Sequence, residues 1–188
     1  MKGNFLSIPT DCPQRDERLG WTGDIQIFSP TANFLYNTTG MLQGWLKDLA
    51  VETIRDEPKG VVPLVVPNVI PANFTGREAA WADASIIVPW DLYKTSRDSE
   101  VLANQYESMK TWIEKGIPRQ SNGLWNPELH QLGDWLDLAT PPSQPGNGKT
   151  DPYLVANAYL VHITELMAGI VKVLKLKDDE SYYSKEAS

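Results

Sequence analysis

Apolar side chains recur every three or four residues along much of this chain, which is the spacing of one face of an α-helix. Residues 41–55 show the pattern best, because Leu42, Trp45 and Leu46 fall on one face and most of the charged side chains fall off it. The same spacing predicts further helices over residues 24–36, 79–95, 99–115 and 151–176, and the beginning of another after residue 178. The chain is therefore expected to be all-α.

Prolines and acidic residues predict how these helices begin and bend. Pro30 lies inside the first predicted helix and Pro89 inside the third, where a proline removes a backbone hydrogen bond and bends or breaks a helix. Asp24 and Asp98 are placed to accept hydrogen bonds from the free N–H groups of a helix start. Pro152 suits the first turn of the longest helix.

Two long segments, residues 57–76 and 116–150, lack helical periodicity and are rich in proline and glycine. Shorter turns join the predicted helices into pairs: 24–36 with 41–55, 79–95 with 99–115, and 151–176 with the last helix. Such pairs suit an α/α toroid, in which long loops gather at one end and carry the functional residues. We therefore predict one domain over residues 1–188 with this architecture.

The last predicted helix is short. Asp178 and Asp179 are good residues to begin it, but the sequence stops at Ser188 after about two turns, a length that gains little stability alone. We interpret the chain as the N-terminal portion of a longer domain that is cut within this helix, with a frayed natural terminus as the alternative. Part of a toroid leaves helix faces uncovered, so marginal stability and self-association are expected.

Composition narrows the choice of partners. The formal net charge is −7, without a cluster of Lys or Arg, which argues against nucleic acids and anionic membrane surfaces. One cysteine excludes an internal disulfide, and with only two histidines a zinc site, or any other metal or cofactor, is not expected. Residues 153–176 are the most apolar, but His162, Glu165 and Lys172 interrupt them, so no membrane span is expected. The first residues lack the apolar core of a signal peptide, which leaves the compartment open.

Residues 11–24, DCPQRDERLGWTGD, bring together acidic, basic and aromatic side chains. The charged and aromatic members are Asp11, Arg15, Asp16, Glu17, Arg18, Trp21 and Asp24. Cleavage of a glycosidic bond needs a protonated carboxylic acid, and nearby carboxylates or burial against an aromatic ring raise a pKa enough to provide one. The chain also holds seven tryptophans, whose rings can pack on the C–H face of a sugar. A sugar site is favoured, although a solvated charged loop has the same composition.

Three blocks of the sequence resemble a known family. NFLSIPTDCPQRDERLGWTGD over residues 4–24, WADASIIVPWDLY over 81–93 and LGDWLD over 132–137 are similar, in this order, to segments of α-L-rhamnosidases of glycoside hydrolase family 78. The resemblance covers essentially the whole chain. It implies an (α/α)6 barrel and an enzyme that removes terminal α-L-rhamnose with inversion, acting on a rhamnose-containing glycoside or polysaccharide.

The resemblance also implies roles for individual residues. Glu17 matches the general acid, and Trp21 matches an aromatic residue that lines the sugar pocket. Asp11, Arg15 and Asp24 match residues that contact the rhamnose hydroxyls, and Trp81, Asp83, Asp134 and Trp135 are expected to face the site. The general base of the family comes later in the barrel, so this chain alone is expected to have little or no activity.

Each of these residues also has a structural interpretation. Trp81 can belong to the core and Asp83 to a solvated helix face, while Trp45 and Trp112 fit helix faces and are expected to pack. Cys12 is expected to be a small buried residue and not a nucleophile. Three other functions stay open: another (α/α)6 sugar hydrolase or phosphorylase, a non-catalytic carbohydrate-binding fragment, and a helical scaffold.

Overall fold

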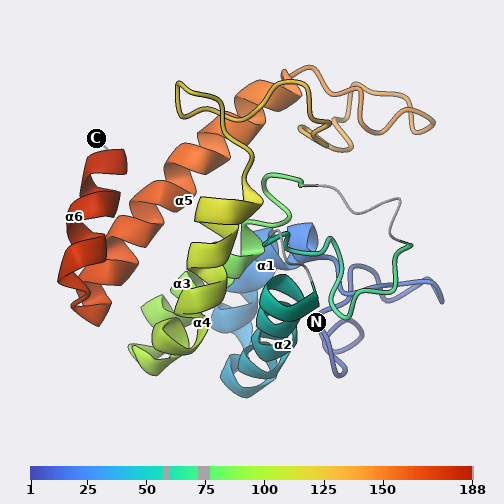
Figure 1. The fold of residues 1–188 in the computed structure, drawn as a ribbon. Coiled ribbons are helices and arrows are strands. Elements are labelled where there is room, and N and C mark those ends of the chain that lie inside the picture. Colours follow the sequence, from blue (N-terminus) through green and yellow to red (C-terminus); the bar gives the residue numbers. More distant parts are fainter. Residues whose placement is uncertain (57–59, 72–76, 188) are drawn as a thin grey trace.

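The protein is all-α over the part that the computed structural model describes, residues 1–56, 60–71 and 77–187 (Figure 1). The α-helices are α1 (Thr22–Leu35), α2 (Thr39–Val51), α3 (Ala84–Ser96), α4 (Glu100–Thr111), α5 (Pro152–Leu174) and α6 (Lys177–Glu186). Single π-helical turns extend α2 and α4, namely η1 (Glu52–Asp56) and η3 (Trp112–Gly116). The described residues form isolated β-bridges but no strand, which confirms the predicted fold class.

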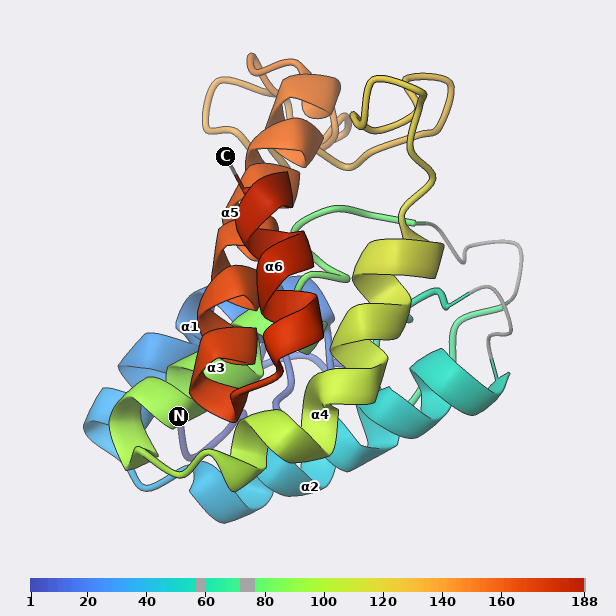
Figure 2. The ribbon, with the colours of Figure 1, turned by 60° about the vertical axis from the view of Figure 1, so that its left-hand side comes forward.

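The helices form two layers. α3 lies between α1 and α5 and packs against both, while α2, α4 and α6 cover these three helices from the other side (Figures 1 and 2). The predicted pairs α3 with α4 and α5 with α6 are in direct contact. The predicted pair of α1 with α2 is not, however, the main contact of either helix, because α1 packs chiefly on α3 and α2 on both α3 and α4.

The irregular segments gather at one end of the helices. α1, α3 and α5 each follow a long segment, whereas α2, α4 and α6 follow the short connections 36–38, 97–99 and 175–176. In Figure 1 the long segments lie toward the right and the top, and the short connections toward the bottom and the lower left. The N-terminal ends of α1, α3 and α5 therefore point toward the region in which a site is expected.

Proline does not interrupt α1 or α3. α1 runs through Pro30 to Leu35, because the residues around Pro30 are fixed against α3: Ser29 donates a hydrogen bond to Asp91, and Ala32 is fully buried. α3 likewise runs through Pro89 to its last residue. Of the predicted bend or break at Pro30, the break does not occur, since tertiary packing outweighs the single backbone hydrogen bond that proline removes.

Two helix starts differ from the prediction. α1 begins at Thr22 after Trp21, so Asp24 lies in the first turn and does not cap it. α3 begins at Ala84, because Ala80 has a φ of 67° and a left-handed residue cannot continue a right-handed helix. Trp81 and Asp83 consequently stand in a turn before the helix. At α5 the prediction is confirmed: Asp151 accepts hydrogen bonds from two N–H groups, and Pro152 is the first helical residue.

The core contains the two tryptophans that were expected to pack. Trp45 and Trp112 are buried, and Trp125 lies against Trp112 with ring centroids 6.1 Å apart. The indole of Trp45 donates a hydrogen bond to the carbonyl of Val66 at 3.1 Å, which fixes the segment before α3 onto α2. Within the long segment predicted over 57–76, residues 57–59 and 72–76 lie outside the described residues.

α5 is the most apolar helix. By length and composition it is long and apolar enough to cross a membrane, contrary to the expectation from its interrupting charges, although core helices of soluble proteins meet the same criteria. Ile163, Met167 and Ile170 are fully buried, and α5 packs against α3, α4 and α6. These contacts assign the buried face of α5 to the helical core.

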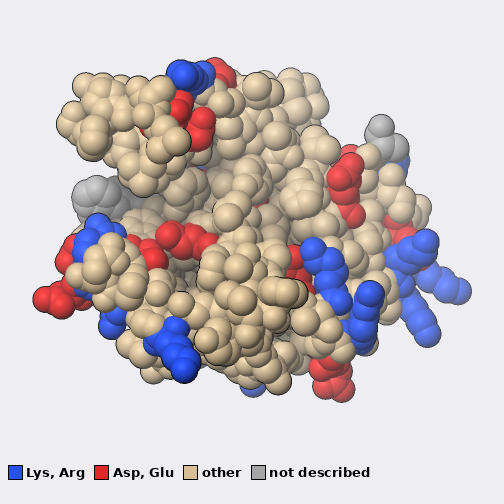
Figure 3. All heavy atoms as spheres, turned by 180° about the vertical axis from the view of Figure 1, so that it is seen from behind, with Lys and Arg blue, Asp and Glu red and all other residues tan. Residues whose placement is uncertain are grey.

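Apolar side chains remain exposed on α1 and α5. Phe34 is 87% exposed, and Ile27, Leu154 and Val161 are each more than half exposed. On the face shown in Figure 3, several Lys and Arg side chains gather toward the lower right, with acidic side chains around them. These faces leave room for further contacts, and self-association stays a prediction.

Candidate active site

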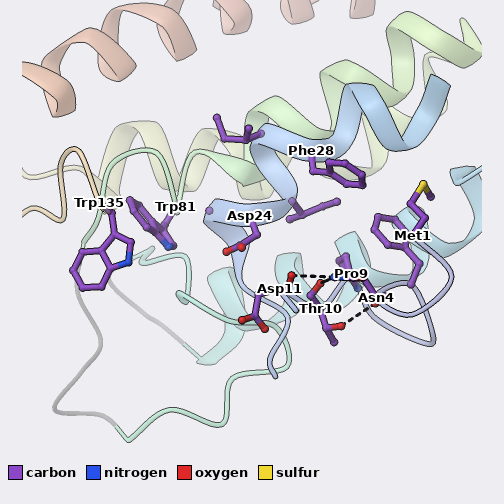
Figure 4. A pocket seen from close by; sticks show the side chains of 13 residues that line it. Met1, Asn4, Pro9, Thr10, Asp11, Asp24, Phe28, Trp81 and Trp135 are labelled. Carbon is purple, nitrogen blue, oxygen red and sulfur yellow. Dashed lines mark hydrogen bonds between the residues drawn. The ribbon is translucent and has the colours of Figure 1, made fainter. Parts of the chain in front are cut away.

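A hollow of about 480 Å³ opens where three irregular segments meet the start of α1. This volume falls in the range of small-molecule sites. Its lining comes from the N-terminal segment, the first half of α1, the turn before α3 and the loop before α5 (Figure 4): Met1, Asn4, Phe5, Pro9, Thr10, Asp11, Gly23, Asp24, Ile25, Ile27, Phe28, Trp81 and Trp135. Four of the predicted site residues, Asp11, Asp24, Trp81 and Trp135, are thus brought together.

Asp11 is held by a network within its own loop. Its Oδ1 accepts the backbone N–H of Leu19 at 2.9 Å, and its Oδ2 accepts Arg15 and the thiol of Cys12, each at 2.7 Å. The side chain is only 9% exposed. Burial acts to raise the pKa of Asp11, but the hydrogen bonds from Cys12, Leu19 and Arg15 outweigh it and hold this pKa below its ordinary value. Asp11 is therefore a fixed, ionised acceptor.

Asp24 is held differently. It stands in the first turn of α1, and Figure 4 shows its carboxylate between Asp11 and Trp81. Asp24 reaches solvent through the mouth of the pocket, yet the surrounding protein displaces enough water to raise its pKa, and the negative charge of Asp11 adds to this rise. The two pocket carboxylates thus have pKa values that are shifted in opposite directions.

Trp81 packs directly on the start of α1. A Cβ added at Gly23 would lie 2.5 Å from the indole nitrogen of Trp81, so only glycine leaves room for the ring in this place. The turn that carries Trp81 is closed by Asp83, which accepts the N–H of Ala80 at 2.7 Å and the indole N–H of Trp112 at 2.8 Å. Trp81 therefore stands on a turn that is fixed to the core.

Asp83 itself does not line the pocket. It is almost completely buried, and burial raises its pKa to about 6 although the hydrogen bonds from Trp112 and Ala80 favour the ionised form. The structure gives Asp83 a supporting place beneath Trp81 and does not place it on the solvated face that was the alternative. Asp134 also lies outside the lining, where it accepts a hydrogen bond from Thr150 at 3.3 Å.

Trp135 forms the other aromatic wall. Its side chain is 42% exposed. Gly146 lies against the ring, since a Cβ added at Gly146 would be 3.4 Å from the nearest ring atom. Two residues earlier, Gly133 has a φ of 61° and touches Pro152 at the start of α5. The left-handed backbone at Gly133 thus turns the loop so that Trp135 reaches the pocket.

Glu17 is not buried against an aromatic ring. Its side chain is 70% exposed and its Oε1 lies 3.5 Å from the Nε of Arg15, and neither residue belongs to the lining of the pocket. Trp21 is also outside the lining, where its backbone forms an isolated bridge with Val65. The expectation of an aromatic enclosure around Glu17 is not met within the described residues, because residues 13–17 of its loop are exposed to solvent.

The family of the chain follows from a match over its whole length. Residues 1–188 match the family described as the bacterial alpha-L-rhamnosidase 6 hairpin glycosidase domain. The chain belongs to this family. The helix pairs and the long loops at one end of the rhamnosidase domain are the architecture that the resemblance implied.

Solved structures agree with this assignment. A native α-L-rhamnosidase from Aspergillus terreus is 46% identical and superposes with a TM-score of 0.95, and the match covers 100% of this chain but 21% of that one. An α-L-rhamnosidase from Streptomyces avermitilis in complex with L-rhamnose is 36% identical with a TM-score of 0.79, over 98% of this chain and 16% of that one.

Sequence relatives show the same proportions. The α-L-rhamnosidase of Streptomyces avermitilis is 39% identical over 173 residues, which are 92% of this chain and 15% of the relative. The corresponding enzyme of Alteromonas sp. is 36% identical over 97% of this chain and 19% of its own length. This rhamnosidase-family chain therefore spans less than a fifth of these curated relatives.

Several residues at or beside the pocket were not predicted. Phe5 and Phe28 line the apolar end of the pocket, and their rings meet edge to face with centroids 6.3 Å apart. Phe28 could have been found from the sequence, because it lies one helical turn after Asp24 on α1. Glu78 and Gln131 lie outside the lining and join the segments of Trp81 and Trp135 by hydrogen bonds, and the sequence gave no signal for either. Among the described residues, no group of three or more His, Cys, Asp and Glu side chains is arranged to hold a metal ion.

Proposed function

We propose that this domain is part of an α-L-rhamnosidase that removes terminal α-L-rhamnose by an inverting acid/base reaction. One observation carries the proposal: Asp11 and Asp24 share a single hollow with Trp81 and Trp135 at the loop end of a domain of this family. The relative from Streptomyces avermitilis, whose structure is a complex with L-rhamnose, supports rhamnose as the sugar.

The pocket offers two kinds of contact to such a sugar. The ionised Asp11 and its neighbour Asp24 accept hydrogen bonds from ring hydroxyls, which is what fixed carboxylates do best. The faces of Trp81 and Trp135 pack on the C–H groups of the ring and on the methyl group that distinguishes a 6-deoxy sugar. Binding by the pocket thus combines orientation by charge with an apolar wall.

Glu17 is proposed as the general acid. In an inverting reaction the acid protonates the glycosidic oxygen while a second carboxylate, roughly 6.5–9.5 Å away, deprotonates the water that attacks the anomeric carbon from the opposite face. Because Asp11 and Asp24 are engaged as sugar acceptors in this proposal, the base is assigned to a carboxylate outside residues 1–188.

The test is hydrolysis of nitrophenyl glycosides by the full-length protein. We expect strong preference for the α-L-rhamnoside, and NMR of the first product should show the β-anomer. Glu17→Gln should lower kcat by a factor of about 100–10,000, the range for loss of a general acid. Asp16→Asn is the matched control, because Asp16 is an exposed carboxylate in the same loop that the proposal does not use.

The chain by itself supplies a further test. Residues 1–188 alone should show almost no turnover if the base lies elsewhere, and substantial turnover would require a base within this chain, for which Glu128 is the first candidate. Equal hydrolysis of several unrelated glycosides by the full-length protein would instead favour another six-hairpin sugar enzyme.

A non-catalytic carbohydrate-binding role is the second candidate. The 70% exposure of the Glu17 side chain favours it, because Glu17 lies outside the lining of the pocket in which the sugar is proposed to bind. Both candidates expect Glu17→Gln to bind L-rhamnose as the unaltered protein does. Only the hydrolase loses turnover in that variant, so binding and turnover measured together separate the two candidates.

A further inference from the structure

The two tryptophans of the pocket come from segments that are far apart in the chain. Trp81 lies in the turn before α3 and Trp135 in the loop before α5, and both line the pocket of Figure 4. Neither residue belongs to a helix. Irregular segments are mobile unless specific contacts hold them, so a fixed position of one ring relative to the other requires a connection between the two segments.

That connection is a set of reciprocal hydrogen bonds. The backbone N–H of Leu132 donates to Glu78 Oε2 at 2.8 Å, and His130 Nδ1 lies 3.2 Å from Glu78 Oε1. In return, Gln131 accepts the backbone N–H of Ala79 at 2.9 Å and donates to the carbonyl of Arg77 at 2.8 Å. Each segment thus sends one side chain to the backbone of the other.

The connected segments are short and partly buried. Glu78 is 4% exposed and Gln131 8% exposed, so water does not readily replace these bonds. Each bonded position lies three residues before its tryptophan, Glu78 before Trp81 and Leu132 before Trp135. Any displacement at this connection therefore reaches each tryptophan across only three residues of backbone.

The connection has a fixed side and a dependent side. The turn that carries Trp81 is independently fixed to the core through Asp83 and Trp112. The loop that carries Trp135 is exposed over most of residues 135–150, and its bonds to the segment of Glu78 fix its beginning. Glu78 thus acts mainly on Trp135.

We infer that Glu78 is a positioning residue, which together with Gln131 holds Trp135 beside Trp81 and so sets the affinity of the pocket for the sugar ring. The inference rests on the proposed function for its ligand. It assigns Glu78 no contact with the sugar and no proton transfer.

The experiment measures backbone hydrogen exchange and rhamnoside kinetics on the full-length protein. Glu78→Ala should speed amide exchange over residues 130–136 and raise KM for nitrophenyl α-L-rhamnoside about tenfold, the effect of losing one stacking contact, with little change in kcat or in its pH profile. Glu78→Gln should restore most of the affinity, because the amide oxygen still accepts the N–H of Leu132. In a Trp135→Ala background, adding Glu78→Ala should change KM by less than about twofold.

Asp179→Ala is the matched control. Asp179 joins α6 to α4 through hydrogen bonds with Lys110 and Tyr106 at 2.9 and 2.6 Å. Asp179→Ala therefore removes a connection between two elements outside the pocket, so it should lower stability and leave KM unchanged. The inference is overturned if Glu78→Ala leaves both exchange and KM unchanged, or if the rise in KM persists without Trp135. If the unaltered protein cleaves no rhamnoside, the proposed function fails, and exchange over residues 130–136 still decides whether Glu78 holds the loop.

Discussion

The acidic and aromatic sides of the pocket are stabilised in opposite ways. On the acidic side, Asp11 is bonded by residues within eight positions of it in one loop, and the bonds depend on charge. On the aromatic side, the bonds span more than fifty residues, join side chains to backbone and are buried. The acidic side therefore fails when a charge is removed, and the aromatic side when segments are displaced relative to each other.

The largest effect is expected from Asp11→Ala, which breaks the acidic side. It removes an acceptor from the sugar and leaves Arg15 and the N–H of Leu19 without their shared partner. With charge-assisted hydrogen bonds worth about 1.5–3 kcal/mol each, we expect kcat/KM to fall about 1,000-fold. Steady-state kinetics measure this loss, and Asp16→Ala should stay near the unaltered value. A fall of less than tenfold would show that the network is dispensable.

The next effect concerns the support of the aromatic side and depends on pH. Burial raises the pKa of Asp83 to about 6, so the folded protein keeps a proton that the unfolded chain releases above its ordinary pKa. The contribution of Asp83 to stability is then greatest below about pH 4, falls by roughly 3 kcal/mol as the pH rises to about 6, and is level above it. In Asp83→Asn this fall should be absent.

Urea unfolding at several pH values between about 4 and 7 measures this change of stability with pH. The pH dependence is the informative quantity, and the absolute stability of Asp83→Asn is not, because the single amide oxygen of asparagine replaces two carboxylate oxygens that each accept a hydrogen bond. Asp16→Asn serves as the control with an exposed carboxylate. An unchanged pH dependence in Asp83→Asn would assign the fall to another group.

A smaller effect is expected from Gly23→Ala, which displaces a ring without altering any charge. The new methyl group would lie 2.5 Å from the Trp81 indole nitrogen, so the ring must move, and we expect KM to rise about tenfold, the loss of one stacking contact. Gly44→Ala is the control, since nothing lies within 4 Å of its added methyl group. It should raise the melting temperature and leave KM unchanged. Equal KM values for both variants would contradict the packing of Trp81 on α1.

The smallest effect is expected from His130→Ala. The imidazole is 78% exposed although it lies 3.2 Å from Glu78, and exposed ion pairs contribute about 0–1 kcal/mol. KM should therefore stay within about twofold of the unaltered value, as steady-state kinetics will show. A large rise in KM would mean that Glu78 holds the loop of Trp135 through the His130 ring and not through the N–H of Leu132.

The helices could be predicted from the sequence for a physical reason, whereas residues 11–24 also suited a solvated charged loop until the family resemblance assigned them to a sugar site. Periodic apolar residues such as Leu42 and Trp45 fix a helix and its buried face locally, and Asp11 finds its partners within its own loop. The resemblance to the rhamnosidase family added Trp81 and Trp135, which no local rule places in a common pocket. Pro30 and the late start of α3 were misjudged, because packing against a neighbouring helix and a left-handed Ala80 override local preferences.

The remaining site residues were out of reach of the sequence. Glu78 and Gln131 occupy no recognisable motif, and their importance comes from partners more than fifty positions away. Asp83 was expected at the pocket or in solvent, but it lies beneath Trp81 and bonds to Trp112. Such places depend on how distant segments meet, which a single sequence does not encode in any local pattern.

The alternation of short and long connections assigns two requirements, holding the helices in place and supplying the side chains of the site, to different residues. The short connections 36–38, 97–99 and 175–176 keep the helices in place. The long segments carry pocket residues such as Asp11, Trp81 and Trp135. Transplanting residues 136–150 from a relative should therefore leave the helices folded, provided that Gln131, Gly133 and Trp135 are kept.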